Sequence, residues 1–347
     1  MSDDILSIIY TFSKKFSDPE TNISFDPKNQ NISAVVNEGN VTITLLVKGQ
    51  TQDLYLNIAR LLKKNVEQIS GVFSVNVIIN SDIDRNKKTN PDDKKFKIDA
   101  RNIIAIASGK GGVGKSTFSV NLATALHSLN LKIGLLDADI YGPSIPRMMG
   151  ISKKPIMNEN KKLIPLENYG LKLMSIGFIL DSEAPTIWRG PMVMKALEQM
   201  FNGVEWGKLD YLIIDLPPGT GDAQLTLAQS SKLTGSIVIS TPQDVAITDA
   251  RKGINMFKKV NVGILGIVEN MSYFMCDNCN QKHYIFSKDG VKKEAEKFNI
   301  PFLGEIPIDT NLRIQSDKGI PSLVDNPDGE ISKKFISIAK NLNKSLS

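Results

Sequence analysis

The stretch that decides the fold is IIAIASGKGGVGKST, residues 103–117. It joins an apolar run, typical of a buried strand, to a glycine-rich segment, and a helical pattern follows. The stretch satisfies G-x-x-x-x-G-K-[ST], a pattern that binds nucleotide phosphates between a strand and a helix. Glycines let backbone N–H groups surround the phosphate oxygens, and the start of the helix adds positive potential. The pattern residues are Gly109, Gly114, Lys115 and Ser116.

Two side chains of this loop can contact the nucleotide or its metal ion directly. The Lys115 ammonium can reach the β- and γ-phosphates, and the Ser116 hydroxyl can ligate Mg²⁺. A glycine-rich turn that matches by chance is the alternative, but the strand before the loop and the helix after it argue against chance. We therefore predict a nucleotide site formed by Gly109, Lys110, Gly111, Gly112, Val113, Gly114, Lys115, Ser116 and Thr117.

From about residue 101 to the end, strand-like runs alternate with helical patterns. Several of the runs are continuously apolar, as expected for strands that are buried on both faces. The sequence therefore predicts an α/β fold with a mostly parallel sheet wrapped by helices. The strand-like runs are residues 102–108, 132–139, 171–177, 210–217, 235–241, 262–270 and 301–307.

The first 100 residues have a different sequence pattern. Residues 1–80 predict a small α/β domain, with helical patterns at 4–16 and 53–69 and two strands joined across Asn37–Asn40. Residues 81–100 are charged and poor in apolar side chains, which indicates a linker. The predicted domains are therefore 1–80 and 101–347, separated by 81–100.

Three aspartates follow apolar strands of the larger domain. Asp137 and Asp139 lie at the end of one strand and Asp215 at the end of another. The carboxyl edge of a parallel sheet is where such folds bind ligands. An aspartate there can also cap the next helix, but three beside a phosphate loop favour a catalytic site. Asp215 is placed to hold Mg²⁺ directly or through water.

The composition indicates a globular protein and excludes several classes. The acidic start MSDDILSII does not fit a secretory signal or a transit peptide, and no apolar run is long enough to span a membrane. The net charge of +5 is spread over 42 basic and 37 acidic residues, so no nucleic-acid partner is expected. Two cysteines suit a reducing compartment, and we expect a cytoplasmic protein.

The two cysteines, Cys276 and Cys279, form a C-x-x-C pair. A redox pair, a partial zinc site with His283 as third ligand, and two structural cysteines are all open alternatives. In a twofold dimer, one pair from each chain would supply four thiolates, which can hold a [4Fe–4S] cluster or a zinc ion.

The loop SGKGGVGKST resembles the deviant Walker A loop of the family that contains nitrogenase iron protein, MinD and ParA. The strings DADIYGPSIPRMMG, WRGPMVMKALEQM, TPQDVAITDARKGINMF and GIVENMSYFMCDNC further resemble the Mrp/ApbC branch of iron–sulfur carriers. This resemblance implies an ATPase that holds a [4Fe–4S] cluster between the two subunits of a homodimer and delivers it to apo-proteins.

The resemblance also implies roles for single residues. Lys110 would cross the dimer interface to the partner's nucleotide, and Asn270 would bind the adenine edge, which favours ATP over GTP. Asp139 would activate water, while Asp137 would serve Mg²⁺ together with Ser116 and Asp215. Gly219 would let a switch loop approach the γ-phosphate. The N-terminal unit lacks the cysteine that many related domains carry, so no ligand role is expected of it.

Two other functions compete with the carrier. A positioning ATPase of the MinD/ParA type would use a nucleotide-gated dimer to bind a surface, and the C-terminal stretch has an apolar stripe with lysines around it. Docking of that stripe on the sheet is favoured over membrane binding, so no stable membrane association is expected. A dimeric zinc-bound ATPase is the third interpretation.

Overall fold

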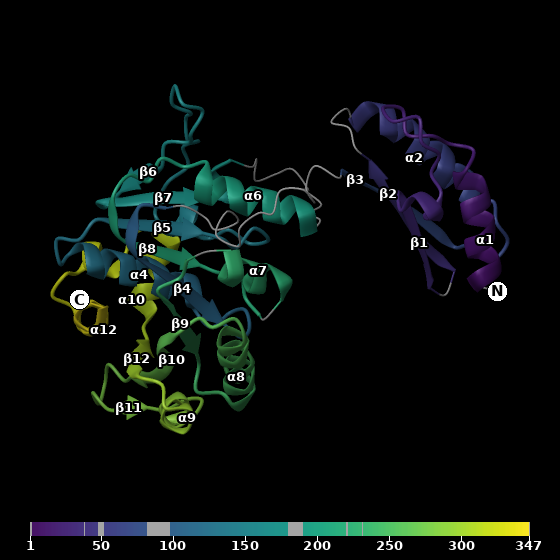
Figure 1. Cartoon of the computed structure of the whole chain (residues 1–347). Coiled ribbons are helices and arrows are strands. Elements are labelled where there is room, and N and C mark those ends of the chain that lie inside the picture. The colour runs from purple at the N-terminus through teal and green to yellow at the C-terminus, as the bar shows by residue number, and fades with distance from the viewer. Residues whose placement is uncertain are drawn as a thin grey trace. The chain divides into compact units, whose positions relative to one another are not determined.

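The computed structural model describes residues 2–37, 39–47, 52–81, 98–179, 190–219, 221–230 and 232–346. The chain divides into two compact units, Met1–Asp93 and Lys94–Ser347 (Figure 1). Most of the expected linker, residues 82–97, lies outside the described residues, as do Trp188 and Arg189 of the WRGPM string. Within the described residues, no helix is both long and apolar enough to cross a membrane.

The N-terminal unit packs two helices on one face of a three-stranded sheet. Antiparallel pairing joins β1 to β2 across Asn37 and Asn40, as the sequence predicts, and β3 adds to β2 in parallel. Burial alternates along β2, so that Ile43 and Leu45 enter a core shared with Tyr55. The elements are α1 (Ser2–Ser13), β1 (Ile32–Asn37), β2 (Asn40–Val47), α2 (Gln52–Val66) and β3 (Ser74–Ser81).

The larger unit is built on a nine-stranded sheet of order β11-β10-β9-β4-β8-β5-β7-β6, in which β12 also pairs with β10. All pairs are parallel except β6 with β7 and β10 with β11. The prediction of a mostly parallel sheet is therefore confirmed. Its strands are β4 (Ala100–Ser108), β5 (Ile133–Asp137), β6 (Leu166–Asn168), β7 (Leu171–Ser175), β8 (Leu209–Asp215), β9 (Gly235–Ser240), β10 (Ile264–Met275), β11 (Lys282–His283) and β12 (Phe302–Ile308).

Helices cover both faces of this sheet (Figure 1). One core lies between the sheet and α4, α5, α11 and α12. Residues of α6, α7 and α8 form the core on the other face, and α8 and α9 enclose a smaller cluster. The helices are α4 (Lys115–His127), α5 (Ile145–Met148), α6 (Gly190–Asn202), α7 (Asp222–Ser230), α8 (Asp244–Lys259), α9 (Gly290–Phe298), α10 (Thr310–Lys318), α11 (Ser322–Asp325) and α12 (Glu330–Leu346).

The C-terminal helix α12 docks on the domain. Its apolar stripe, which includes Phe335, Ile338 and Leu342, is buried in the same core as α4. The ring of Phe335 lies 5.8 Å, centroid to centroid, from that of Phe118 on α4. The stripe that could have bound a membrane is therefore used for packing, as the sequence favoured.

Strand β10 differs from the expectation, because it does not end at Asn270. It continues to Met275, immediately before the first cysteine. Met271 adopts a positive φ of 54°, and the register with β12 shifts between Asn270 and Phe274. The strand is thus bent in its middle, and its second half carries the chain toward the cysteine loop.

Candidate functional site

The phosphate loop lies between β4 and α4, at the carboxyl edge of the sheet. Gly114 has a φ of 83°, and a Cβ there would overlap the Asn270 amide nitrogen, so only glycine fits. The loop borders a hollow of about 210 Å³. Its lining residues are Ser108, Gly111, Gly112, Gly114, Lys115, Ser116, Thr117, Asp139 and Pro218.

Buried polar contacts connect the side chains at the base of this hollow. The Lys115 ammonium lies 2.8 Å from Asp215 Oδ2, and both side chains are almost completely buried. The Ser116 hydroxyl donates to the same oxygen at 2.5 Å, while Ser119 donates to Asp215 Oδ1 at 2.7 Å. These hydroxyl and carboxylate oxygens are the hard ligands that Mg²⁺ prefers, so Ser116 and Asp215 fit a magnesium site. Ser119 is a contributor that the sequence motif did not reveal.

Asp137 and Asp139 lie in the same region but in different environments. Asp137 is completely buried, and its carboxylate accepts hydrogen bonds from the backbone N–H groups of Asp139, Ser144 and Ile145 and from the Ser175 hydroxyl. Burial, together with the nearby Asp215 charge, raises the pKa of Asp137 to about 7. Asp139 lines the hollow, and partial burial raises its pKa as well.

Asn270 and Gly219 contact the phosphate loop and the strand before it. The Asn270 amide donates to the Val113 carbonyl at 2.8 Å, so this side chain supports the loop backbone. Gly219 has a φ of 96°, and its N–H donates to the Ser108 carbonyl at 3.0 Å. A contact between Asn270 and adenine stays a prediction.

The cysteine pair lies in a tight loop that follows β10. Backbone hydrogen bonds close the loop, from Asn280 N to Cys276 O at 2.8 Å and from Cys276 N to Gln281 O at 3.1 Å. Both thiols are free; Cys279 is exposed and Cys276 half-buried. N–H groups of Cys279 and Asn278, and the Cys279 thiol, donate to the Cys276 sulfur and lower its pKa. This thiol therefore ionises more readily, as a metal ligand must.

His283 joins the two cysteines. Its Nε2 lies 3.8 Å from the Cys279 sulfur, and the ligand atoms of Cys276, Cys279 and His283 all lie within 4.8 Å of one another. The pairing of β10 with β11 brings this about, because it sets His283 opposite Phe274.

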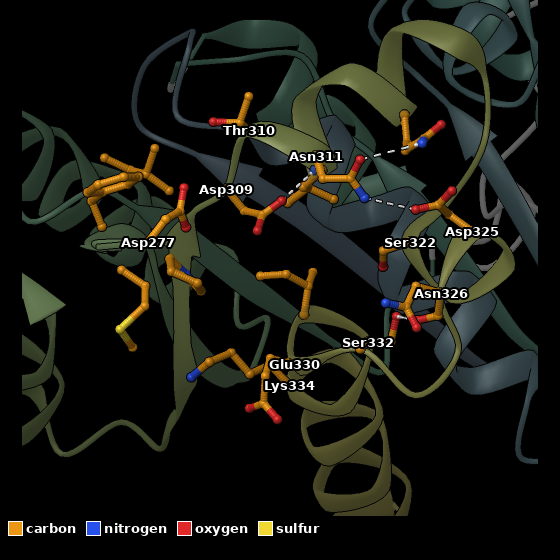
Figure 2. A pocket seen from close by; sticks show the side chains of 18 of the residues that line it. Asp277, Asp309, Thr310, Asn311, Ser322, Asp325, Asn326, Glu330, Ser332 and Lys334 are labelled. Atoms are coloured by element: carbon orange, nitrogen blue, oxygen red, sulfur yellow. Dashed lines mark hydrogen bonds between the residues drawn. The ribbon is translucent and has the colours of Figure 1, made fainter. Parts of the chain in front are cut away.

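A second cavity, of about 540 Å³, begins beside the cysteine loop (Figure 2). Asp277, which lies between the two cysteines, forms one side of it, and α10, α11 and the start of α12 form the other. Asp309, Asp325 and Glu330 add further carboxylates, and Lys334 is the one lysine among the described residues of the lining. Carboxylates therefore outnumber lysines among the described residues of this cavity, which favours the approach of cations to it.

A phosphate loop at the carboxyl edge of a mostly parallel, doubly covered sheet defines a P-loop NTPase. The family model described as ParA, NUBPL iron-transfer P-loop NTPase, matches residues 99–343. The chain belongs to this family.

Relatives agree with this membership. The chain is 54% identical over 247 residues to an iron–sulfur protein of Arabidopsis thaliana, described as required for NADH dehydrogenase; the match covers 71% of this chain and 79% of the relative. An iron–sulfur cluster carrier protein of Synechocystis is 40% identical and matches over 96% of each chain, so its match spans both units.

Solved structures show the same fold. A nucleotide-binding protein of Archaeoglobus fulgidus in complex with ADP aligns with a TM-score of 0.60 at 39% identity, over 68% of this chain and 93% of that one. MinD of Pyrococcus furiosus aligns with a TM-score of 0.54 at 22% identity, over 70% of this chain and 99% of that one, which shows likeness of fold alone. The family model and the relatives together confirm the predicted resemblance to iron–sulfur carriers.

Proposed function

We propose that this protein is an ATP-dependent carrier that binds a [4Fe–4S] cluster as cargo and delivers it to apo-proteins. One observation supports this best. Strand β10 contacts the phosphate loop through Asn270 and ends at Met275, next to the cysteine pair. One strand thus joins the phosphate loop to the cysteine loop, which supports control of the cysteines by nucleotide.

ATP would bind with its phosphates in the loop hollow. Lys115 would exchange its contact with Asp215 for the β- and γ-phosphates, and Mg²⁺ would be held by Ser116 and Asp215, with Asp137 as a further predicted contributor. Asp139, at the wall of the hollow, would position the attacking water. Mg²⁺ supplies charge stabilisation for phosphoryl transfer.

The cluster would be held between two subunits. One chain has only two cysteines, whereas a [4Fe–4S] cluster takes four thiolates, so a twofold dimer supplies the set. The accessible position of Cys279 supports this arrangement, since the loop can meet a second copy or an apo-protein. Lys110 would reach across the dimer to the partner's nucleotide.

Anaerobic reconstitution with iron and sulfide, followed by size-exclusion chromatography, tests the carrier. A brown dimer with about four irons per two chains, absent in Cys276→Ala, is the expected result. A colourless protein, or cluster formation that survives Cys276→Ala, would contradict the proposal.

The nucleotide half has its own test. Lys115→Ala should abolish ATP binding or hydrolysis while leaving reconstitution by the cysteines possible. Unchanged ATPase activity in this variant would refute the assignment of the phosphate loop.

A further inference from the structure

We propose that Cys276, Cys279 and His283 form a three-ligand site within one chain, which holds a single divalent metal ion of the zinc or iron(II) type. The inference rests on the proposed function, since it uses the same two thiolates, and adds a binding state that needs no second subunit. Each chain would then bind a metal ion as a monomer, before or apart from the shared cluster.

The distances fit this site. In a tetrahedral zinc site, neighbouring sulfur and nitrogen ligands lie about 3.5–3.8 Å apart, given bonds of about 2.3 Å to sulfur and 2.0 Å to nitrogen. His283 Nε2 and the Cys279 sulfur already lie 3.8 Å apart. The three ligand atoms are within 4.8 Å of one another, so only small shifts of the side chains are needed to close the site.

The backbone of the loop fixes where these ligands lie. His283 belongs to β11, and its neighbour Lys282 is tied to the sheet by an ion pair with Glu305 at 3.0 Å. The Lys282 ammonium also lies 4.0 Å from the centre of the Tyr273 ring on β10. Because β11 is anchored at Lys282, the imidazole is held on the same side of the hairpin as the thiols.

The ligand set determines the class of metal. Two thiolates and an imidazole suit zinc, iron(II) and cobalt(II), and disfavour Mg²⁺ and Ca²⁺. Three protein ligands leave the fourth tetrahedral position to water or to an incoming ligand, the arrangement of sites that exchange rather than store. A thiolate of an acceptor protein can enter that position, so the site is suited to transfer. Asp277, which lies between the two cysteines in the sequence, adds a carboxylate that favours a cation at this loop.

Cobalt(II) titration of the full-length, tag-free chain tests the inference, under anaerobic conditions with reductant and without iron or sulfide. Wild type should bind one cobalt per chain as a monomer, with tetrahedral d–d bands and a thiolate-to-cobalt charge-transfer band, and Zn²⁺ should displace it. Loss of an outer-shell partner alone costs about 10–100-fold in metal affinity. His283→Ala should therefore weaken cobalt binding at least about tenfold.

Three further variants make the result specific. His283→Cys should restore the affinity and intensify the charge-transfer band, because a thiolate replaces the imidazole. Gln281→Ala, in the same loop, should leave both unchanged, since Gln281 contributes its backbone carbonyl to the loop. The chain has one other histidine, His127 on α4, so His127→Gln should leave the cobalt spectrum as in wild type.

The outcomes separate this inference from the carrier function. Cobalt binding that is unchanged in His283→Ala, or that occurs only in dimers with one ion per two chains, would overturn the three-ligand site while the shared cluster could still form. A monomer that binds cobalt through His283, but a chain that never forms the dimeric cluster, would support the site and contradict the carrier.

Discussion

Replacing Ser119 by alanine is the sharpest test of how the floor of the nucleotide site is built. Ser119 is completely buried on α4, and its hydroxyl donates to Asp215 Oδ1 at 2.7 Å. The other carboxylate oxygen, Oδ2, accepts a hydrogen bond from the Ser116 hydroxyl and forms the ion pair with the Lys115 ammonium. Ser119 thus holds Oδ1 of Asp215, the oxygen that the phosphate loop does not contact. The Ser119 hydrogen bond therefore helps to set the orientation of the Asp215 carboxylate, the proposed magnesium ligand.

The expected cost follows from the kind of hydrogen bond. A hydrogen bond to a charged group contributes about 1.5–3 kcal/mol, and alanine leaves a buried carboxylate oxygen without this donor. We expect Ser119→Ala to lower the free energy of unfolding by this amount. Because Ser119 also orients the carboxylate of the proposed magnesium ligand, we expect the Mg²⁺ concentration for half-maximal ATPase activity to rise as well; a rise of about tenfold corresponds to about 1.4 kcal/mol.

Urea unfolding and Mg²⁺ titration of the ATPase measure the two effects. Both tryptophans of the chain, Trp188 and Trp206, belong to the larger unit, so tryptophan fluorescence reports on that unit. Ser128→Ala is the matched control, because Ser128 follows the same helix and its hydroxyl donates to the backbone carbonyl of Ala125 instead of a carboxylate. If the two variants had equal stability and an equal Mg²⁺ requirement, the role given to Ser119 would be wrong.

Three further predictions concern the dimer, the C-terminal helix and pH. Lys110→Ala should lower ATPase activity about tenfold or more, while nucleotide binding to the monomer, followed with a fluorescent analogue, stays within a few-fold. Equal activity would exclude a role across the dimer. Phe335→Ala should cost about 3–5 kcal/mol in urea unfolding, and a loss below about 1 kcal/mol would contradict the docking of α12. Because burial raises the pKa of Asp137 from 3.8 to about 7, the folded protein binds more protons in this window, so its stability should fall as pH rises through it, by at most about 1.4 kcal/mol per pH unit. Asp137→Asn should flatten that dependence, and an identical slope in both proteins would refute it.

Much of the larger domain could be predicted because its signals are local. The strand, loop and helix around Lys115 lie within one short stretch, and strands such as β8 and β9 are continuous apolar runs with all or nearly all residues buried. The sequence alone therefore places the phosphate loop and the three aspartates at one edge of the sheet. Helix α10 gave no such signal, since none of its residues is buried and no apolar stripe marks it.

The features that the sequence does not reveal depend on contacts between distant segments. Ser119 and Ser175 hydrogen-bond to Asp215 and Asp137 across 96 and 38 residues, and no spacing in the sequence predicts such pairs. Strand β10 was expected to stop at Asn270, where the polar pair Glu269 and Asn270 interrupts the apolar run. Its extension depends on pairing with β12 and β11, the second of which is only two residues long.

That extension gives the molecule a physical route between its two candidate sites. The loop carbonyl of Val113 is held by Asn270 at 2.8 Å, and Cys276 lies six residues further along the same segment. Coupling between two ligand sites needs about 1–3 kcal/mol, and leaving one buried hydrogen-bonding group unsatisfied costs about as much. A nucleotide that moves the loop must therefore either carry Asn270 along or break this bond. In the first case we expect the bend at Met271 to move with it and the geometry of the cysteine loop to change. The free energy of this one hydrogen bond is therefore large enough to couple the nucleotide state to the proposed binding of metal by the cysteines.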